Sequence, residues 1–255
     1  MKKLLSIILS LTMLLTLAAC GSKGASLKKI QKAGKLVIAT SPDFPPFESL
    51  DGSGKVAGIE IDILEEVCAQ LGVSLEIQQM DFDSVLPGVQ AGKYDMGVSG
   101  ITVTEKRQKN VLFTDAYCLA AQAIVVKEGS PISSKADLEG KTVAVQTGTT
   151  AESFCMDNGY TVSAYAANND AQSALLQGKL DAWVIDDLTA ADMVKVYNAQ
   201  GGDQLVILGE AMTTEPYAFA MAFGSEDTIE LRVKVSGSGP SSAKAVRQSK
   251  DRENR

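Results

Sequence analysis

Short apolar runs rich in β-branched residues alternate with amphipathic helical patterns along most of this sequence. The run 35–40 has the pattern of a strand, and the segment 59–71 that follows has the pattern of a helix. In this helix apolar residues share one side, acidic residues share the other, and Gly72 marks its end. Strand–helix alternation of this kind predicts parallel sheets with helices on both faces, so the expected fold class is α/β.

The alternation divides into two units. The first continues with strands expected at 75–80 and 94–98 and a helix between them at 84–91. In the second, strands are expected at 142–145, 161–165 and 180–185, and helices at 149–158, 168–177 and 188–199. Two extended runs, 117–127 and 215–222, flank the second unit and are predicted to be connecting strands rather than part of either core. A chain that crosses into a second lobe and returns predicts two α/β lobes, two connecting strands and a ligand cleft between the lobes.

Composition excludes several functions. The chain has 255 residues, 45% of them apolar, which is enough for a substantial core. Its formal net charge of −7 argues against a nucleic-acid partner, because phosphate binding needs a basic patch. The sequence has no histidine, which excludes Ser-His-Asp and Cys-His catalysis and histidine-ligated metals. Its cysteines lack metal-site spacing, so we expect no metal and no cofactor.

The first residues predict the compartment. Lys2 and Lys3 precede an apolar stretch, 4–19, which is shorter than the roughly 20 residues of a membrane-spanning helix. This pattern predicts an exported signal peptide over residues 1–19. The stretch ends in Leu-Ala-Ala-Cys, which resembles a bacterial lipobox. The resemblance implies that Cys20 becomes a lipidated N-terminus carrying acyl chains such as palmitate; a plain signal peptide with an incidental cysteine is the alternative.

The lipidated cysteine and a tether, together residues 20–34, would then hold a folded protein near a membrane surface.

Three more cysteines follow the tether, at 68, 118 and 155. We expect them to be packing residues, because a buried thiol behaves as a small hydrophobic group. An extracytoplasmic location would nevertheless permit a disulfide.

Polar groups follow several of the expected strands. Thr102 and Glu105 have the spacing of a capping box, which predicts a helix start with free backbone N–H groups. Arg107 then lies in the first turn, where the helix dipole disfavours a cation unless an anion binds beside it. A guanidinium can hold a carboxylate through two parallel hydrogen bonds, although a solvated surface arginine is the alternative. Thr149 and Glu152 repeat the spacing, which predicts either a second anion site or an ordinary cap.

Asp186 follows the apolar run 182–185, so its carboxylate is expected at the C-terminal edge of a sheet, facing the cleft. There it could bind an ammonium group, whereas Asp187 is expected to cap the next helix. An anion-binding group on one lobe and a carboxylate on the other would together fit an α-amino acid.

Short motifs occur along the chain in a characteristic order. They are PFE at 46–48, GIEIDI at 58–63, LPGVQAGKYD at 86–95, TEKR at 104–107, FTDAY at 113–117, DLEGK at 137–141 and GKLDA at 178–182. In this order, behind a lipobox, they resemble the bacterial extracellular solute-binding proteins of family 3. These are substrate-binding lipoproteins of polar amino-acid ABC transporters, with a type II periplasmic-binding-protein-like fold. The resemblance covers residues 35–224.

The resemblance implies an amino-acid site. Arg107 would bind the ligand α-carboxylate, and Asp186 would bind the α-ammonium group. Backbone groups of four residues would help Arg107: Ser99, Gly100, Thr102 and Thr150. Phe44 and Phe82 would pack on opposite sides of the ligand side chain, with core packing as the alternative for each.

The ligand side chain stays open. Family members that bind basic side chains carry an acidic residue near the aromatic one. Here that position is Ser41, and Asp43 stands one residue before Phe44. Asp43 either faces the ligand side chain or makes the turn that the neighbouring prolines indicate. Aliphatic, amide, sulfur-containing and basic amino acids are all compatible with these residues.

The resemblance places the first lobe at 35–118 plus 220–235 and the second lobe at 119–219. After this the sequence departs from the family pattern, because SGSGP at 236–240 interrupts an expected helix and few apolar residues follow. We therefore expect the tail, 236–255, to be disordered. Our interpretation is a frameshifted or foreign C-terminus that leaves part of the first lobe uncovered.

These features predict the extracytoplasmic binding component of an amino-acid ABC transporter, a lipid-anchored monomer without catalytic activity. It would close two lobes around an amino acid and deliver it to a membrane permease. One alternative is an amino-acid sensor that signals through another protein. A second is an enzyme resembling cyclohexadienyl dehydratase, whose general acid or base would have to be Asp43, Glu48 or Asp186.

Overall fold

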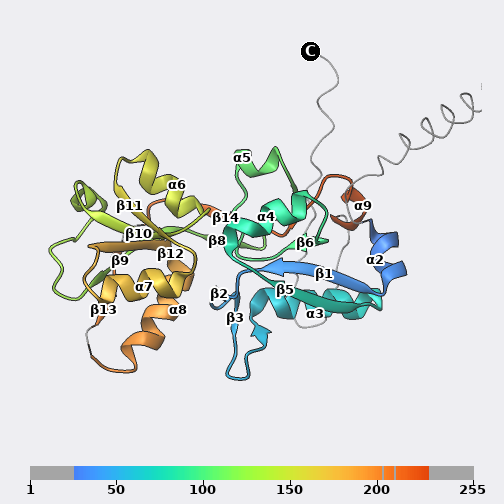
Figure 1. Ribbon diagram of the computed structural model, residues 1–255, viewed down its shortest axis with the longest axis horizontal. Coiled ribbons are helices and arrows are strands. Elements are labelled where there is room, and N and C mark those ends of the chain that lie inside the picture. Colours follow the sequence, from blue (N-terminus) through green and yellow to red (C-terminus); the bar gives the residue numbers. More distant parts are fainter. Residues whose placement is uncertain (1–25, 203, 210, 230–255) are drawn as a thin grey trace, which may run out of the picture.

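The computed structural model describes residues 26–202, 204–209 and 211–229, which form two mixed α/β lobes side by side (Figure 1). The predictions for the signal peptide, for lipidation of Cys20 and for the tail 236–255 lie outside the described residues. Among the helices within these ranges, none has the length and apolarity needed to cross a membrane.

The first lobe is built on a five-stranded sheet in which strands from both ends of the described chain meet. Its strands, in spatial order, are β5 (Ser74–Gln79), β1 (Lys35–Thr40), β6 (Met96–Gly97), β15 (Ala220–Met221) and β7 (Leu112–Phe113). β5 and β6 run parallel to β1, whereas β15 is antiparallel to β6 and β7. The late strand β15 therefore completes the first sheet after the chain has returned from the second lobe.

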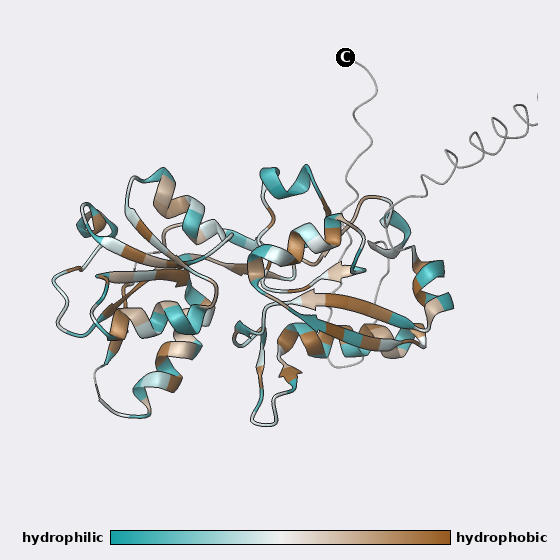
Figure 2. Ribbon diagram, in the orientation of Figure 1, coloured by the Kyte–Doolittle hydropathy of each residue, from teal (hydrophilic) through white to brown (hydrophobic). Residues whose placement is uncertain are grey.

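Helices cover both faces of this sheet. α3 (Ile59–Leu71) packs its buried side chains against Leu36 and Ile38 of β1. Ala39 belongs instead to the cluster of α4 (Phe82–Gln90) on the opposite face, because successive strand residues point to opposite sides. Figure 2 shows the hydrophobic residues concentrated on β1 and α3, as this packing requires.

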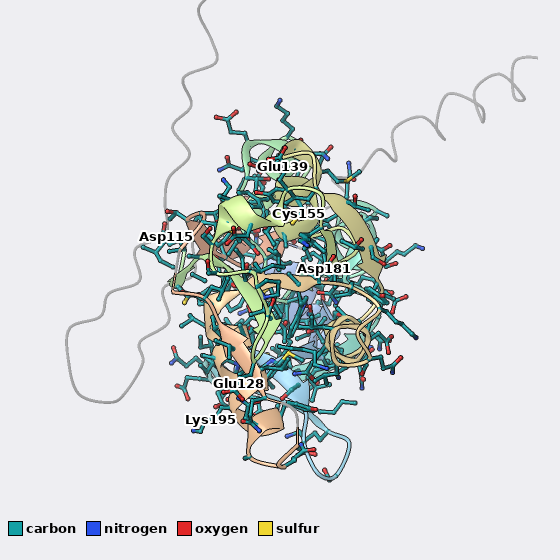
Figure 3. The ribbon with its side chains drawn as sticks, turned by 90° about the vertical axis from the view of Figure 1, so that its left-hand side faces the viewer. Asp115, Glu128, Glu139, Cys155, Asp181 and Lys195 are labelled. Atoms are coloured by element: carbon teal, nitrogen blue, oxygen red, sulfur yellow. The ribbon has the colours of Figure 1, made fainter. Side chains whose placement is uncertain are left out.

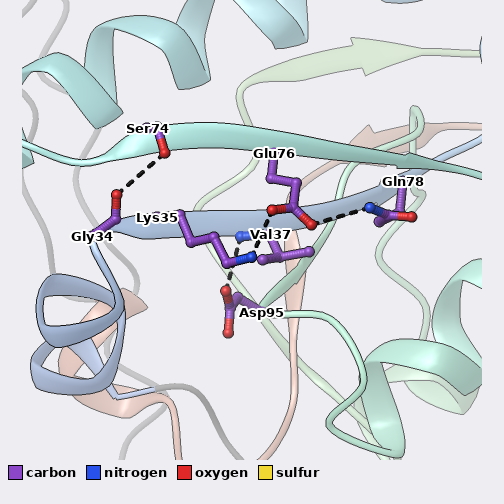
Figure 4. Close-up of polar contacts among 7 residues, drawn as sticks. All are labelled: Gly34, Lys35, Val37, Ser74, Glu76, Gln78 and Asp95. Atoms are coloured by element: carbon purple, nitrogen blue, oxygen red, sulfur yellow. Dashed lines mark hydrogen bonds and ion pairs between the residues drawn. The ribbon is translucent and has the colours of Figure 1, made fainter.

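Polar contacts hold the first half of β1 to its neighbours on both sides (Figure 4). Lys35 Nζ and Glu76 Oε2 form an exposed ion pair at 2.7 Å. The Val37 backbone N–H donates to Asp95 Oδ2 at 2.8 Å, which joins the start of β1 to the loop before β6. An exposed ion pair contributes at most about 1 kcal/mol, so the buried clusters account for most of the stability of this lobe.

Residues 27–33, assigned from sequence to the tether, form helix α2 (Leu27–Ala33), which corrects that prediction. The Ser26 side chain accepts a hydrogen bond from the Lys29 backbone and caps this helix. Ile30 is buried in the core cluster of the first lobe, and its burial is the physical reason that the segment folds.

The second lobe has its own five-stranded sheet. In spatial order its strands are β11 (Thr161–Tyr165), β10 (Thr142–Gln146), β12 (Ala182–Asp186), β9 (Gln122–Lys127) and β13 (Leu205–Ile207). Helix α6 (Thr150–Asp157) packs on one face, and α7 (Asn168–Leu176) and α8 (Asp187–Asn198) pack on the other. Figure 3 views this lobe from its end, with the exposed Glu139 at one extremity and Glu128 and Lys195 at the other.

The run 117–127 was predicted to be a connector rather than part of either core, and this is only partly correct. Its first part, β8 (Cys118–Ala120), pairs antiparallel with β14 (Glu215–Tyr217) in a two-stranded link between the lobes. Its second part is β9, an almost wholly buried strand between β12 and β13. The length of the apolar run 123–126 reflects this burial in the second core.

The remaining described elements are short. They are β2 (Asp43–Phe44), β3 (Glu48–Leu50), β4 (Val56–Ala57), α5 (Glu105–Gln108), the 3-10 helix η1 (Lys135–Leu138) and α9 (Glu226–Ile229). The three described cysteines are free. Cys68 and Cys155 are buried in the hydrophobic clusters, and Cys118 packs against one, which agrees with the predicted packing role.

Candidate functional site

A cleft between the lobes is lined by both of them. From the first lobe it is lined by Asp43, Phe44, Phe82, Ser99, Gly100, Thr102 and Arg107, and from the second by Gln122, Gln146, Thr149, Thr150, Ala151, Asn168, Val184, Ile185 and Asp186. All eight residues that the family resemblance assigned to ligand binding line this cleft. Their contacts with a ligand stay a prediction.

Arg107 lies in the short helix α5, but the cap differs from the one predicted. The Thr104 side chain, not Thr102, accepts a hydrogen bond from the Arg107 backbone N–H, at 3.1 Å. Thr102 instead forms an isolated β-bridge with Tyr217. This extended pairing delays the start of the helix until after Thr104.

The Arg107 guanidinium reaches across the cleft. Its Nη1 donates to the first-lobe carbonyl of Thr102 at 2.9 Å, and its Nη2 donates to the second-lobe carbonyl of Gly148 at 3.1 Å. It also lies 5.5 Å from the centre of the Phe82 ring, within the range of a cation–π contact. Burial lowers the pKa of this group, while the nearby carboxylates of Glu215 and Asp186 oppose the change.

Asp186 ends strand β12, as predicted, and is buried. Its carboxylate accepts hydrogen bonds from the Tyr217 hydroxyl and from Gln122 Nε2. Burial raises the pKa of Asp186 to about 7, with further increases from Glu215 and Asp187.

Asp187 was predicted to cap helix α8, and this is wrong. Asp186 is the N-cap residue because it still has the extended backbone of β12. Asp187 is the first residue of the helix, and its Oδ1 accepts hydrogen bonds from the backbone of Ala121 at 3.1 Å and Leu188 at 2.8 Å. It therefore fixes the start of α8 against the end of the connector.

The N-terminus of α6 opens onto the cleft. The Thr149 side chain accepts from the Glu152 backbone at 3.1 Å, as the capping pattern predicts. Glu152 Oε2 accepts a hydrogen bond from the Gly148 backbone N–H at 2.7 Å. In a standard capping box it would accept from the N–H of the N-cap residue, which here is Thr149. Thr150, the first residue of the helix, lines the cleft. A helix N-terminus in this position favours a negatively charged ligand group.

Two of the predicted ligand contacts, those of Gly100 and Phe44, also have partners within the protein. The Gly100 N–H, expected to bind the ligand carboxylate, donates to the buried Glu60 carboxylate at 3.2 and 3.3 Å. Gly100 has φ +52°, and an added Cβ would lie 2.5 Å from the Phe44 ring. Phe44 both lines the cleft and packs on Phe47, with their ring centres 6.0 Å apart. The binding and packing interpretations of Phe44 are therefore compatible.

Asp43 joins the two lobes at the cleft. Its carboxylate accepts from the Asn168 backbone at 2.6 Å, from Gln146 Nε2 at 3.1 Å and from the Ser41 hydroxyl at 3.1 Å. Burial raises its pKa. Ser41 does not line the cleft and instead orients Asp43.

Sequence reasoning missed three polar residues that line the cleft: Gln122, Gln146 and Asn168. Gln122 is a polar residue within the apolar run of β9, which was the available signal. Gln146 ends β10 and Asn168 begins α7, two places where strand and helix ends face the cleft. Asn168 Nδ2 donates to Gln146 Oε1 at 3.0 Å, so the two amides form one network with Asp43.

Gly148 of the second lobe lies close against Asp83 of the first lobe. It has φ +80°, and an added Cβ would lie 2.9 Å from the Asp83 Cβ and 3.1 Å from its Cα. We expect Gly148→Ala to keep the lobes apart and to weaken ligand binding at least about tenfold, since overpacking costs roughly 1–3 kcal/mol. Calorimetric titration with the ligand measures this loss.

Gly140→Ala is the matched control, because Gly140 has φ +72° and nothing lies within 4 Å of its added Cβ. Both variants carry the same type of backbone strain, and only Gly148→Ala meets the other lobe. Equal affinities for the two variants would contradict the prediction.

Two α/β lobes, joined by a pair of antiparallel strands and facing each other across a polar cleft, define a type II periplasmic-binding-protein fold. The family model described as "Bacterial extracellular solute-binding proteins, family 3" matches residues 36–249. The chain belongs to this family.

Named relatives agree with the family match. The chain is 32% identical to the arginine-binding extracellular protein ArtP of Bacillus subtilis, over 76% of this chain and 77% of that protein. It is 33% identical to the lysine/arginine/ornithine-binding periplasmic protein of Escherichia coli, over 88% and 84%. The arginine-bound form of truncated ArgBP from T. maritima superimposes with a TM-score of 0.75 at 38% identity, covering 80% of this chain and 95% of that one.

The family match extends further than sequence analysis placed the resemblance. It ends at residue 249 rather than at 224, and so includes most of the segment that was set apart as a foreign tail.

Proposed function

We propose that this chain is the extracytoplasmic substrate-binding component of an amino-acid ABC transporter, and that its ligand is an α-amino acid with a basic side chain, arginine first. Arg107 and Thr150 would hold the α-carboxylate, and Asp186 would hold the α-ammonium group. Phe44 and Phe82 would enclose the side chain. The lobes would close around the ligand and present it to a membrane permease.

The observation that carries this proposal is a guanidinium and a carboxylate that line the cleft and form no direct ion pair among the described residues. The Arg107 guanidinium donates to two carbonyls, and the Asp186 carboxylate accepts from a hydroxyl and an amide. The ion pairs within the described residues lie elsewhere, on the exposed surface. An α-amino acid supplies both missing charges at once, and partly desolvated charge pairs are stronger than exposed ones.

Asp43 supports a basic side chain. Among the residues that line the described cleft, Asp43 and Asp186 are the acidic ones. Asp43 is bonded to neutral groups, so its negative charge is available to a cationic ligand side chain. ArtP, the lysine/arginine/ornithine-binding protein and ArgBP are named for ligands of this kind.

The proposed location of the protein is outside the cytoplasm. The relatives are named as extracellular or periplasmic proteins, which supports an extracytoplasmic site of action. A cleaved signal peptide and a lipid on Cys20 are supported by the sequence pattern.

The test is a thermal melt of the purified protein with each of the 20 amino acids. A ligand at about 1,000 times its Kd adds about 4 kcal/mol to the free energy of unfolding, so its shift in Tm is large. We expect arginine, and then lysine or histidine, to give the largest shifts. A cooperative melt that no amino acid moves would contradict the proposal.

The same samples address the enzymatic alternative. Binding without catalysis predicts that the ligand is recovered chemically unchanged after prolonged incubation. Conversion of the ligand by the protein would favour the dehydratase-like alternative instead.

A further inference from the structure

Two buried carboxyl groups lie directly behind the first-lobe wall of the cleft. Glu48 on β3 and Glu60 on α3 are fully shielded from solvent, each with 0% exposure. The ion pairs among the described residues involve neither of them. Two neighbouring buried carboxylates without a cation strongly disfavour the state in which both are charged.

Their hydrogen bonds distinguish the two groups. Gly100 N donates to both Glu60 oxygens, at 3.2 and 3.3 Å, and the Tyr117 hydroxyl donates to Glu60 Oε1. Glu60 is therefore an acceptor towards both neighbours. Glu48 Oε1 accepts from the Ser99 hydroxyl at 2.9 Å. Within the described part of the chain, Glu48 Oε2 has no hydrogen-bond partner, and the Glu60 carboxyl group lies next to the Glu48 carboxyl group.

Because the other oxygens of the two carboxyl groups accept hydrogen bonds, Glu48 Oε2 is the oxygen left to carry a proton. The charged or titratable groups that face Glu48 are Glu60 on α3, Asp43 on β2 and Tyr117 before β8. None of them is a cation. Burial first, and then the charge of Glu60, raise the pKa of Glu48 well above its usual range.

The two carboxyl groups also form hydrogen bonds with residues that line the cleft. Glu48 binds the Ser99 side chain and Glu60 binds the Gly100 N–H, so the two carboxyls hold adjacent residues that line the cleft. In a trans peptide the N–H and C=O point in opposite directions, so the bond to Glu60 turns the Ser99 carbonyl away from the pair. Tyr117 links the same carboxylate to the chain entering β8.

We propose that Glu48 and Glu60 share one proton in the folded protein, and that as positioning residues they hold the Ser99–Gly100 backbone in its ligand-binding conformation. The second half rests on the proposed amino-acid binding function. The first half does not depend on any ligand.

The first experiment compares Glu48→Gln with Glu60→Gln by calorimetric titration with L-arginine. A glutamine at 48 keeps a donor towards Glu60 and an acceptor for Ser99, so its affinity should fall much less than that of Glu60→Gln. A glutamine at 60 brings an NH2 group against Gly100 N–H or Tyr117 O–H, so its affinity should fall at least tenfold. Equal affinities for the two variants would overturn the positioning role.

The second experiment measures unfolding of the wild type and of Glu48→Gln without ligand between pH 5.5 and 7.5. The folded wild-type pair binds one proton more than the unfolded chain in this window, and folded Glu48→Gln does not. The unfolding equilibrium constant of the wild type should therefore rise with pH relative to that of the variant, by up to about tenfold per pH unit.

A ratio that does not change with pH would overturn the shared proton, and this outcome stays decisive if Glu60→Gln fails to fold. Failure of the proposed function has a different signature, because the wild type would then bind no amino acid while the pH comparison is unaffected.

Discussion

Replacing Arg107 with methionine is expected to weaken amino-acid binding by more than about 100-fold. Methionine keeps much of the aliphatic volume but removes the cation that would face the ligand α-carboxylate. Truncating one partner of a buried, hydrogen-bonded charge pair typically costs about 2–5 kcal/mol. The variant also loses the bond to the Gly148 carbonyl, which joins the lobes at 3.1 Å.

The control is Lys106→Met, which removes the neighbouring exposed cation and should bind as well as wild type. Arg107→Lys should fall between the two, because an ammonium group keeps the charge but cannot form two parallel hydrogen bonds. Calorimetric titration gives each Kd, and a melt without ligand confirms folding. Near-normal binding by Arg107→Met would show that Arg107 does not hold the ligand α-carboxylate.

Replacing Asp186 with asparagine is expected to weaken binding by a similar factor at pH 7.5 and to change its pH dependence. In the wild type the carboxylate has a pKa of about 7 and must be ionised to hold an ammonium group. Ligand binding below pH 7 therefore requires loss of a proton. The affinity is fully present above this pKa and falls as the pH drops through it.

From pH 7.5 to pH 5.5 the wild-type affinity should fall by about 20-fold, since each pH unit below the pKa costs up to a factor of ten. Asp186→Asn cannot titrate at this position and should lose most of this dependence. Titrations at four pH values measure both slopes. Parallel pH profiles for the two proteins would show that Asp186 does not hold the ammonium group.

Elements with a strong local pattern were predictable from the sequence. The strand 35–40 and the helix 59–71 have the predicted bounds, because their apolar periodicity directly records which face is buried. Helix α2 was missed because its single buried side chain, Ile30, gives little periodicity. The strand character of 122–127 was recognised, but its place inside the second sheet depends on tertiary pairing with β12 and β13.

The candidate site shows the same limit. Arg107 and Asp186 were identified because a cation in a first helical turn and a carboxylate after a buried strand are locally unusual. The network of Asp43, Gln146 and Asn168 was not predictable, since these residues come from separate elements of two lobes. The hydrogen bond from the Gly100 N–H to Glu60 was likewise not predictable, because the two residues are 40 positions apart in the sequence.

Two calorimetric titrations test the amino-acid site most directly, one with L-arginine and one with agmatine, which is arginine without its α-carboxylate. An amino acid held between Arg107 and Asp186 predicts that agmatine binds at least about 100-fold more weakly than arginine. Equal affinities would show that the α-carboxylate contributes nothing to binding, and would contradict an α-amino-acid site in this cleft.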